Sequence, residues 1–217
     1  MKQEEVMQLL DKLYDKSIQG IPKVSPPINE LANDYLKKSK DVETAAKSFV
    51  NYQVAKCTTS GFVTGLGGIV TLPVAIPANV SSVMYVQMRM IACLAYMGGY
   101  DTNSDQVQTL VYACLAGISV DQIIKNVGIQ FGTKLTMAMV KKIPGSVLTK
   151  INQKVGFRFI TKFGTKGVIN IGKAIPLVGG VISGGFDFAE TKIIAKRAYK
   201  MFIEGDFSVG SDTADDI

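Results

Sequence analysis

Apolar residues recur every three or four positions along most of this 217-residue chain, which is the period of an α-helix. The spacing predicts an amphipathic helix over residues 3–18, which Gly20 and Pro22 end. A second helix is expected after Ser25-Pro26-Pro27, and Asp41 is placed to cap a third. We therefore expect an all-α fold, built as a single compact multi-helix domain.

The rest of the chain repeats this helical pattern between glycine and proline stops. Further helices are expected over residues 78–96, 104–115, 119–142, 146–163 and 176–203. Asp101, Asn103 or Ser104 can cap the second of these helices, and Pro144-Gly145 separates the third from the fourth.

The pattern divides the chain into three segments. Residues 1–40 are expected to form N-terminal amphipathic helices, and residues 41–204 the main helical domain. Residues 205–217 are acidic and rich in turn formers, which predicts a flexible tail.

The stretch from Cys57 to Met88 contains no charged residue and is punctuated by glycines and two prolines. A membrane-spanning helix needs about 20 apolar residues without strong breaks, whereas Pro73 and Pro77 interrupt this one. We expect a glycine-rich apolar helical hairpin with the prolines in its turn. A re-entrant or interfacial insertion into lipid is the alternative.

Glycines at four-residue spacing remove side chains from one helix face, so that a second helix backbone can approach closely. This spacing occurs at Gly61/Gly65, Gly128/Gly132 and Gly180/Gly184. We predict close helix packing at Gly61, Gly65, Gly67, Gly68, Gly180 and Gly184.

The chain contains no His, which removes the usual general base near neutral pH and the commonest metal ligand. Three widely spaced cysteines form no CxxC pair, so we interpret Cys57, Cys93 and Cys114 as reduced core thiols. No metal and no cofactor are expected. The acidic start at Glu4-Glu5 is unlike a signal peptide, which favours a cytoplasmic location.

The positive charge is concentrated in one part of the chain. Residues 122–186 contain no Asp or Glu, while the flanking segments carry net charges of −1 and −3. The segment contains ten basic residues: Lys125, Lys134, Lys141, Lys142, Lys150, Lys154, Arg158, Lys162, Lys166 and Lys173. Such a run is tolerated if acidic residues elsewhere in the fold or an anionic partner supply the opposite charge.

Within this segment a basic stripe follows an apolar stripe along one predicted helix. Val147, Ile151, Val155, Phe159 and Phe163 recur every four residues and form the apolar stripe. The predicted membrane or anion contacts are Lys150, Lys154, Arg158, Lys162 and Lys166. Such a helix either lies in a membrane interface, with its lysines toward anionic headgroups, or packs on the core with a solvated basic back.

A second candidate site surrounds the one charge on the apolar helix over residues 78–96. A guanidinium there must find acceptors, since burying it unpaired is costly. Its candidate partners are Asp101, Asp121, Asp187 and Glu190. The predicted pocket therefore comprises Arg89, Tyr100, Asp101, Asp187 and Glu190.

Two short motifs that resemble ligand-binding loops lack their context. Gly167–Ala174 has the GxxxxGK spacing of a phosphate-binding loop, but Ala174 replaces the Ser or Thr that would hold magnesium. Gly164–Gly167 matches the GxxG of a KH domain without the strands of that module. Arginines are also scarce, so no nucleic-acid partner is expected.

Several blocks occur in the order seen in EcsC-type proteins. They are Gly61–Gly68, Leu72-Pro73, Ile76–Asn79, Gln87-Met88-Arg89, Gly99-Tyr100-Asp101, Leu110–Gly117 and Ile175–Gly180 through Phe202. The chain therefore resembles the EcsC family over about residues 45–204, with Asp187 where many relatives carry an uncharged, Asn-like residue. The resemblance implies a helical protein of bacterial origin, sometimes discussed beside an ABC transporter system, without an established molecular activity.

These observations lead to two functional hypotheses. The first is a non-enzymatic cytoplasmic protein that binds peripherally to an anionic membrane surface, on the inner face of the cell membrane, or to a membrane protein. The alternative is a hydrolase-like enzyme that acts on a lipid or a small phosphorylated compound without His or metal. No GxSxG, HExxH or paired-carboxylate motif supports the alternative. The sequence leaves the oligomeric state open.

Overall fold

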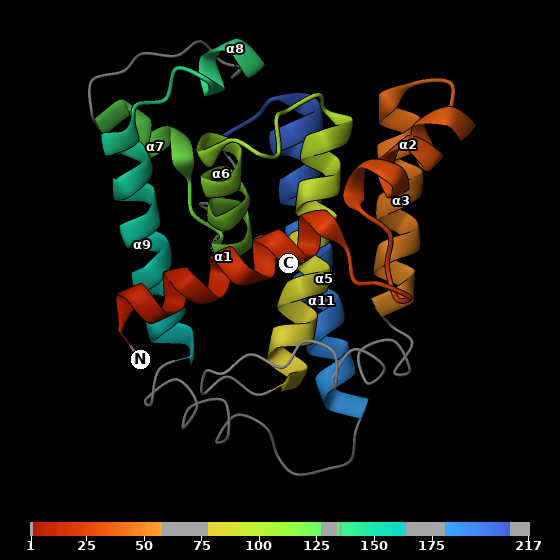
Figure 1. The fold of residues 1–217 in the computed structure, drawn as a ribbon, viewed down its shortest axis with the longest axis horizontal. Coiled ribbons are helices and arrows are strands. Elements are labelled where there is room, and N and C mark those ends of the chain that lie inside the picture. The colour runs from red at the N-terminus through yellow and green to blue at the C-terminus, as the bar shows by residue number, and fades with distance from the viewer. Residues whose placement is uncertain (1, 58–77, 127–133, 135, 164–180, 209–217) are drawn as a thin grey trace.

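A computed structural model of the chain describes residues 2–57, 78–126, 134, 136–163 and 181–208 (Figure 1). The described residues contain no strand, and the prediction of an all-α fold is confirmed. Its α-helices are α1 (Gln3–Gln19), α2 (Ile28–Lys38), α3 (Val42–Cys57), α5 (Ala78–Met97), α6 (Asp105–Ala116), α7 (Val120–Asn126), α8 (Met137–Val140), α9 (Gly145–Phe163) and α11 (Val181–Tyr199). A short π-helix, η1 (Lys200–Glu204), continues α11.

Helix α5 is the centre of the molecule (Figure 1). Every residue from Met84 to Ala95 is buried, so this helix faces other helices on all sides. Helices α1, α2, α6 and α11 all pack against it. An almost uncharged sequence can occupy this position because no face of α5 needs to meet water.

Helix α1 crosses the molecule and joins its two flanks (Figure 1). Its apolar stripe of Val6, Leu9, Leu10 and Leu13 is buried against α5 and α9. On one flank α6 packs on α9, and on the other α2 packs on α3, which also contacts α11. The N-terminal helices are thus part of the same core, and the packing has no boundary at residue 40.

The helix ends follow the signals in the sequence. The Ser104 hydroxyl accepts a hydrogen bond from the backbone N–H of Val107 and caps α6, which confirms one of the three candidate caps. Asp41 accepts from the backbone N–H of Thr44 at 2.7 Å and caps α3 as predicted. Gly117 and Gly205 adopt left-handed conformations that end α6 and η1.

The prediction of one helix over residues 119–142 is wrong. Helix α7 ends at Asn126, and α8 is a separate short helix of four residues. The Thr136 hydroxyl accepts from the backbone N–H of Met139, so this residue starts a new helix inside the predicted one.

The flexible tail does not begin at Gly205 as predicted. Phe207 is buried and packs edge-on against Phe202, with ring centroids 6.3 Å apart. Residues 209–217 lie outside the described residues. So do residues 58–77, which include most of the predicted hairpin, and the predicted start of the last helix at Pro176.

Candidate functional site

Arg89 lies in the middle of α5 with 8% of its surface exposed. Its guanidinium donates hydrogen bonds to the backbone carbonyl oxygens of Ser17, at 2.9 Å, and Pro26. Within the described residues no carboxylate forms an ion pair with it. The expected pairing with Asp101, Asp121 or Glu190 is wrong, because carbonyl groups at the end of α1 and in the α1–α2 connection are the acceptors instead.

The other residues of the predicted pocket lie elsewhere. Tyr100 follows the end of α5 and packs edge-on against Phe202, with ring centroids 5.4 Å apart. Asp101 is exposed and accepts from the backbone N–H of Asn103. Glu190 is half-buried in α11, and the side chain of Asp187 lies outside the described residues. Neither Tyr100, Asp101 nor Glu190 lines the cavity beside Arg89, so the predicted pocket is not assembled.

The two stripes of α9 point in different directions. Val147, Ile151, Val155 and Phe159 are buried against α6 and α1. The apolar stripe therefore belongs to the core, which corrects the alternative in which it lies in a membrane interface. Lys150, Lys154 and Arg158 are exposed on the other face, whereas the Lys162 side chain and Lys166 lie outside the described residues. We call Lys150, Lys154 and Arg158, together with Phe157, the basic face.

Phe157 is the one aromatic side chain of the basic face, and 67% of its surface is exposed. Phe157 is not among the predicted membrane or anion contacts. It lies seven residues after Lys150, and seven residues are almost two full helical turns, so both side chains leave α9 in nearly the same direction. The helical period could have placed Phe157 beside the lysines rather than on the apolar stripe.

A groove of about 830 Å³ runs along this face of α9. One wall comes from the α6–α7 connection and from α7, with Ile118 and Ile123 among its residues. The opposite wall carries all four residues of the basic face. Two isoleucines, an exposed phenylalanine ring and three cations thus line one open depression.

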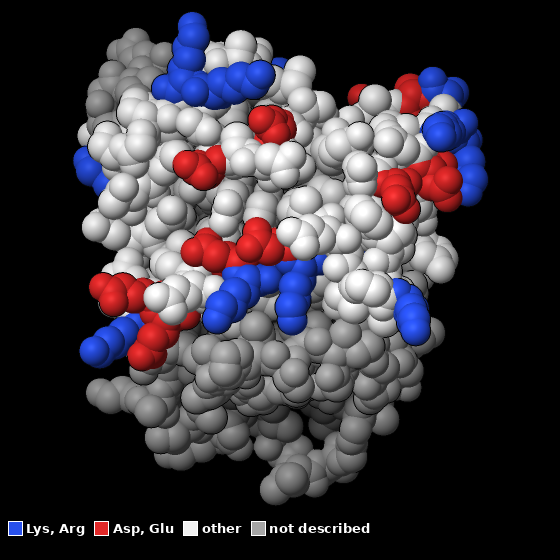
Figure 2. All heavy atoms as spheres, viewed as in Figure 1, with Lys and Arg blue, Asp and Glu red and all other residues white. Residues whose placement is uncertain are grey.

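Seven of the ten basic side chains of the middle segment are described, and one of these seven forms an ion pair with a described carboxylate. Lys125 pairs with Asp121 at 2.9 Å, so local compensation exists at this one position. No described carboxylate forms an ion pair with the other side chains of the segment that the structure describes: Lys134, Lys141, Lys142, Lys150, Lys154 and Arg158. Elsewhere the charges are mixed: Figure 2 shows acidic and basic side chains next to each other where α1 crosses the surface.

Asp121, at the start of α7, forms a small hydrogen-bonded cluster with Ser119 and Lys125. Partial burial raises the pKa of its carboxyl group, but hydrogen bonds from Ser119 and Lys125 outweigh burial and hold the pKa below its usual range. The carboxylate is therefore ionised near neutral pH and neutralises Lys125. Asp121 forms no ion pair with the cations of the basic face, so their positive charge is not neutralised by it.

The glycine predictions fall mostly outside the described residues. Gly61, Gly65, Gly67, Gly68, Gly128, Gly132 and Gly180 are not described, and Gly184 lies within α11 without a described environment. A close approach does occur at Gly98, where a Cβ atom would lie 2.1 Å from the carbonyl oxygen of Phe202. Gly98 is not among the glycines predicted to pack closely.

The described residues contain neither a metal site nor a single membrane-spanning helix. Among the described residues, no group of three or more Cys, Asp or Glu side chains could hold a metal ion. No single described helix has the length and hydropathy to cross a membrane. Helices α6 and α7 have the required length and hydropathy when taken together, but they meet at a bend of 120°.

Comparison of the chain with protein-family models, with curated proteins and with solved structures finds no match. The resemblance to the EcsC family therefore stays a prediction.

Proposed function

We propose that this chain is a non-enzymatic, cytoplasmic protein of the EcsC type that associates peripherally with an anionic membrane through the basic face of α9. One observation supports this most directly: three exposed cations and an exposed aromatic ring share one helix face, and no described carboxylate pairs with the cations. Exposed cations bind anionic headgroups, and an exposed aromatic ring inserts at the boundary between headgroups and acyl chains.

The magnitude of the interaction fits reversible binding. Each Lys or Arg near an anionic leaflet contributes about 1 kcal/mol, so three contribute about 3 kcal/mol. Burying the ring of Phe157 adds about 2 kcal/mol. A total of about 5 kcal/mol corresponds to weak attachment that salt reverses, because the Debye length falls to about 3 Å in 1 M salt.

Co-sedimentation with vesicles tests the proposal. Wild-type protein is expected to sediment with vesicles of phosphatidylglycerol and phosphatidylcholine at low salt, and to be released at high salt. The triple variant Lys150→Gln, Lys154→Gln, Arg158→Gln is expected to lose at least tenfold in vesicle affinity, because about 3 kcal/mol of attraction is removed.

A charge-matched variant is the control. Lys12→Gln, Lys23→Gln, Lys37→Gln removes the same number of positive charges from exposed positions outside α9. It is expected to retain most of the binding. Equal losses in both variants would mean that net charge alone attracts the vesicles, and absence of wild-type binding at low salt would refute the proposal.

A further inference from the structure

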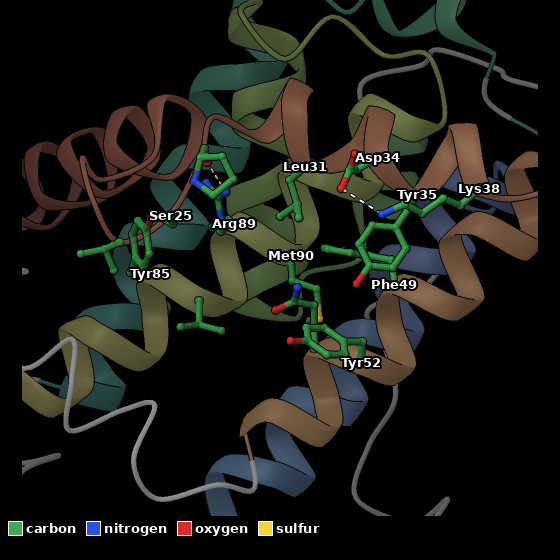
Figure 3. Close-up of a pocket in the computed structure, with 14 residues that line it drawn as sticks. Ser25, Leu31, Asp34, Tyr35, Lys38, Phe49, Tyr52, Tyr85, Arg89 and Met90 are labelled. Atoms are coloured by element: carbon green, nitrogen blue, oxygen red, sulfur yellow. Dashed lines mark hydrogen bonds and ion pairs between the residues drawn. The ribbon is translucent and has the colours of Figure 1, made fainter.

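A cavity of about 420 Å³ lies between α5 and the α2–α3 pair (Figure 3). That helix pair lies on the flank opposite α9 (Figure 1). The volume of the cavity falls within the range of about 300–1,000 Å³ that is typical of small-molecule sites. Figure 3 shows Arg89, Ser25 and Tyr85 at one end and Tyr35 and Tyr52 at the other. The cavity is elongated, and the only arginine among the described residues that line it is at one end.

The guanidinium at that end retains unused hydrogen-bonding capacity. An arginine has five N–H donors, and Arg89 uses two of them in bonds to carbonyl oxygens, so three remain. The two carbonyls are neutral, and no described carboxylate pairs with Arg89. A buried positive charge in such surroundings favours an anion that reaches it through the cavity.

The rest of the cavity wall is suited to an apolar body. Leu31 and Met90 lie between the two ends in Figure 3, and Phe49 lies beside Tyr35 at the outer end. The rings of Tyr35 and Phe49 pack edge-on, with centroids 5.3 Å apart. Lys38 at the rim pairs with Asp34 at 3.2 Å, so the outer end has no net charge.

The charged end is held in place before any ligand arrives. The hydroxyl groups of Tyr85 and Ser25 form a hydrogen bond of 2.7 Å, which fixes the α1–α2 connection against α5. Gly20 has a positive φ of 76° and no room for a Cβ atom, which would lie 2.4 Å from the Ser25 carbonyl oxygen. A rigid connection keeps the Arg89 donors in position, which lowers the cost of binding.

We propose that this cavity binds a small organic acid with a single carboxylate and an apolar chain or ring, with the carboxylate at Arg89. The single arginine matches one carboxylate, and the tyrosine, phenylalanine and methionine side chains match the apolar body. The site is separate from the basic face and does not depend on membrane association.

Isothermal titration calorimetry with decanoate, below its micelle concentration, tests the inference without vesicles. Decanoate is expected to bind wild-type protein at least tenfold more tightly than 1-decanol, because only the acid pairs with Arg89. Arg89→Gln is expected to abolish that difference. Lys12→Gln, which removes an exposed cation of α1 outside both the cavity and the basic face, is the matched control and is expected to bind decanoate like the wild type.

A second variant keeps the test decisive if Arg89→Gln fails to fold. Leu31→Trp leaves Arg89 intact and fills the middle of the cavity, so it is expected to abolish decanoate binding while circular dichroism remains that of a folded helical protein. Equal affinity for decanoate and 1-decanol, no decanoate binding, or unchanged binding by Leu31→Trp would each overturn the inference. Tighter binding of decyl phosphate than of decanoate would overturn the assignment of a carboxylate.

Discussion

Burial changes the chemistry of the cysteines in the core. Cys93 on α5 and Cys114 on α6 are free thiols with almost no exposed surface. Burial raises the pKa of each thiol to about 12, and the nearby Arg89 and Arg197 guanidinium groups offset only part of that rise. The two thiols therefore stay protonated near neutral pH, as expected for core side chains.

This protonation predicts slow thiol chemistry in the folded protein. In a Cys57→Ser background, modification of Cys93 and Cys114 by a disulfide reagent at pH 8 is expected to be at least about a thousandfold slower than in denaturant. The thiolate is the reactive form, and its fraction falls with the raised pKa, relative to about 8.5 in the unfolded chain. Absorbance of the released thiol reports the rate of that reaction.

The raised pKa also makes stability depend on pH. Because the pKa of each thiol is higher in the folded state, the thiols contribute to the free energy of unfolding at pH values below about 8.5, and this contribution is lost progressively as the pH rises toward 12. Unfolding at alkaline pH should therefore accelerate labelling. Rapid labelling of both cysteines at pH 8 in the native protein would contradict the described core.

Phe157 and Arg89 show which features of single residues can be predicted from the sequence and which cannot. The period of α9 is enough to place Phe157 on the basic face, because direction follows from helical geometry. The hydrogen-bond partners of Arg89 cannot be predicted from the sequence in this way. They are the backbone carbonyls of Ser17 and Pro26, which every residue carries, so no pattern of side chains distinguishes them.

At the scale of elements, close contact between the end of α5 and η1 depends on Gly98. A Cβ atom at this position would meet the carbonyl oxygen of Phe202, which is part of the backbone and has little freedom to move. Gly145, at the start of α9, has no heavy atom within 4 Å of the corresponding position. The two glycines form a matched pair for testing the packing of α5 on η1.

Thermal unfolding should separate these two glycines. Gly98→Ala is expected to destabilise the protein by about 2 kcal/mol through overpacking, which lowers the Tm by about 4–8 °C. Gly145→Ala is expected to leave the Tm unchanged or to raise it slightly, because alanine restricts the unfolded chain without a clash. Equal Tm values for the two variants would show that α5 and η1 do not approach as described.

Element boundaries were predictable where a cap or a stop lies in the sequence. Ser104 and Asp41 accept capping bonds, and each lies at the start of a predicted helix. Thr136 is as good a cap by residue type, yet apolar residues continue on both sides of it, and the pattern therefore predicted one helix where the structure has two. A hydroxyl inside an apolar run starts a helix only when the tertiary structure turns the chain there.

Across the whole molecule the two proposed sites lie on opposite flanks. Helix α9 and the α2–α3 pair occupy opposite edges of the view in Figure 1, with α5 and α6 between them. The apolar stripes of α1, α5 and α9 are all used to form one core. The basic face remains exposed, and no described carboxylate forms an ion pair with its three cations.

The most direct test of membrane binding through α9 uses a tryptophan at the basic face. The chain contains no Trp, so Phe157→Trp introduces a single fluorescent probe. Its emission is expected to shift to shorter wavelength on addition of phosphatidylglycerol vesicles at low salt, and to return at high salt. Tyr52→Trp, at a position with 54% exposure on the opposite flank, is expected to show no shift. No shift at position 157, or equal shifts at both positions, would contradict membrane binding through α9.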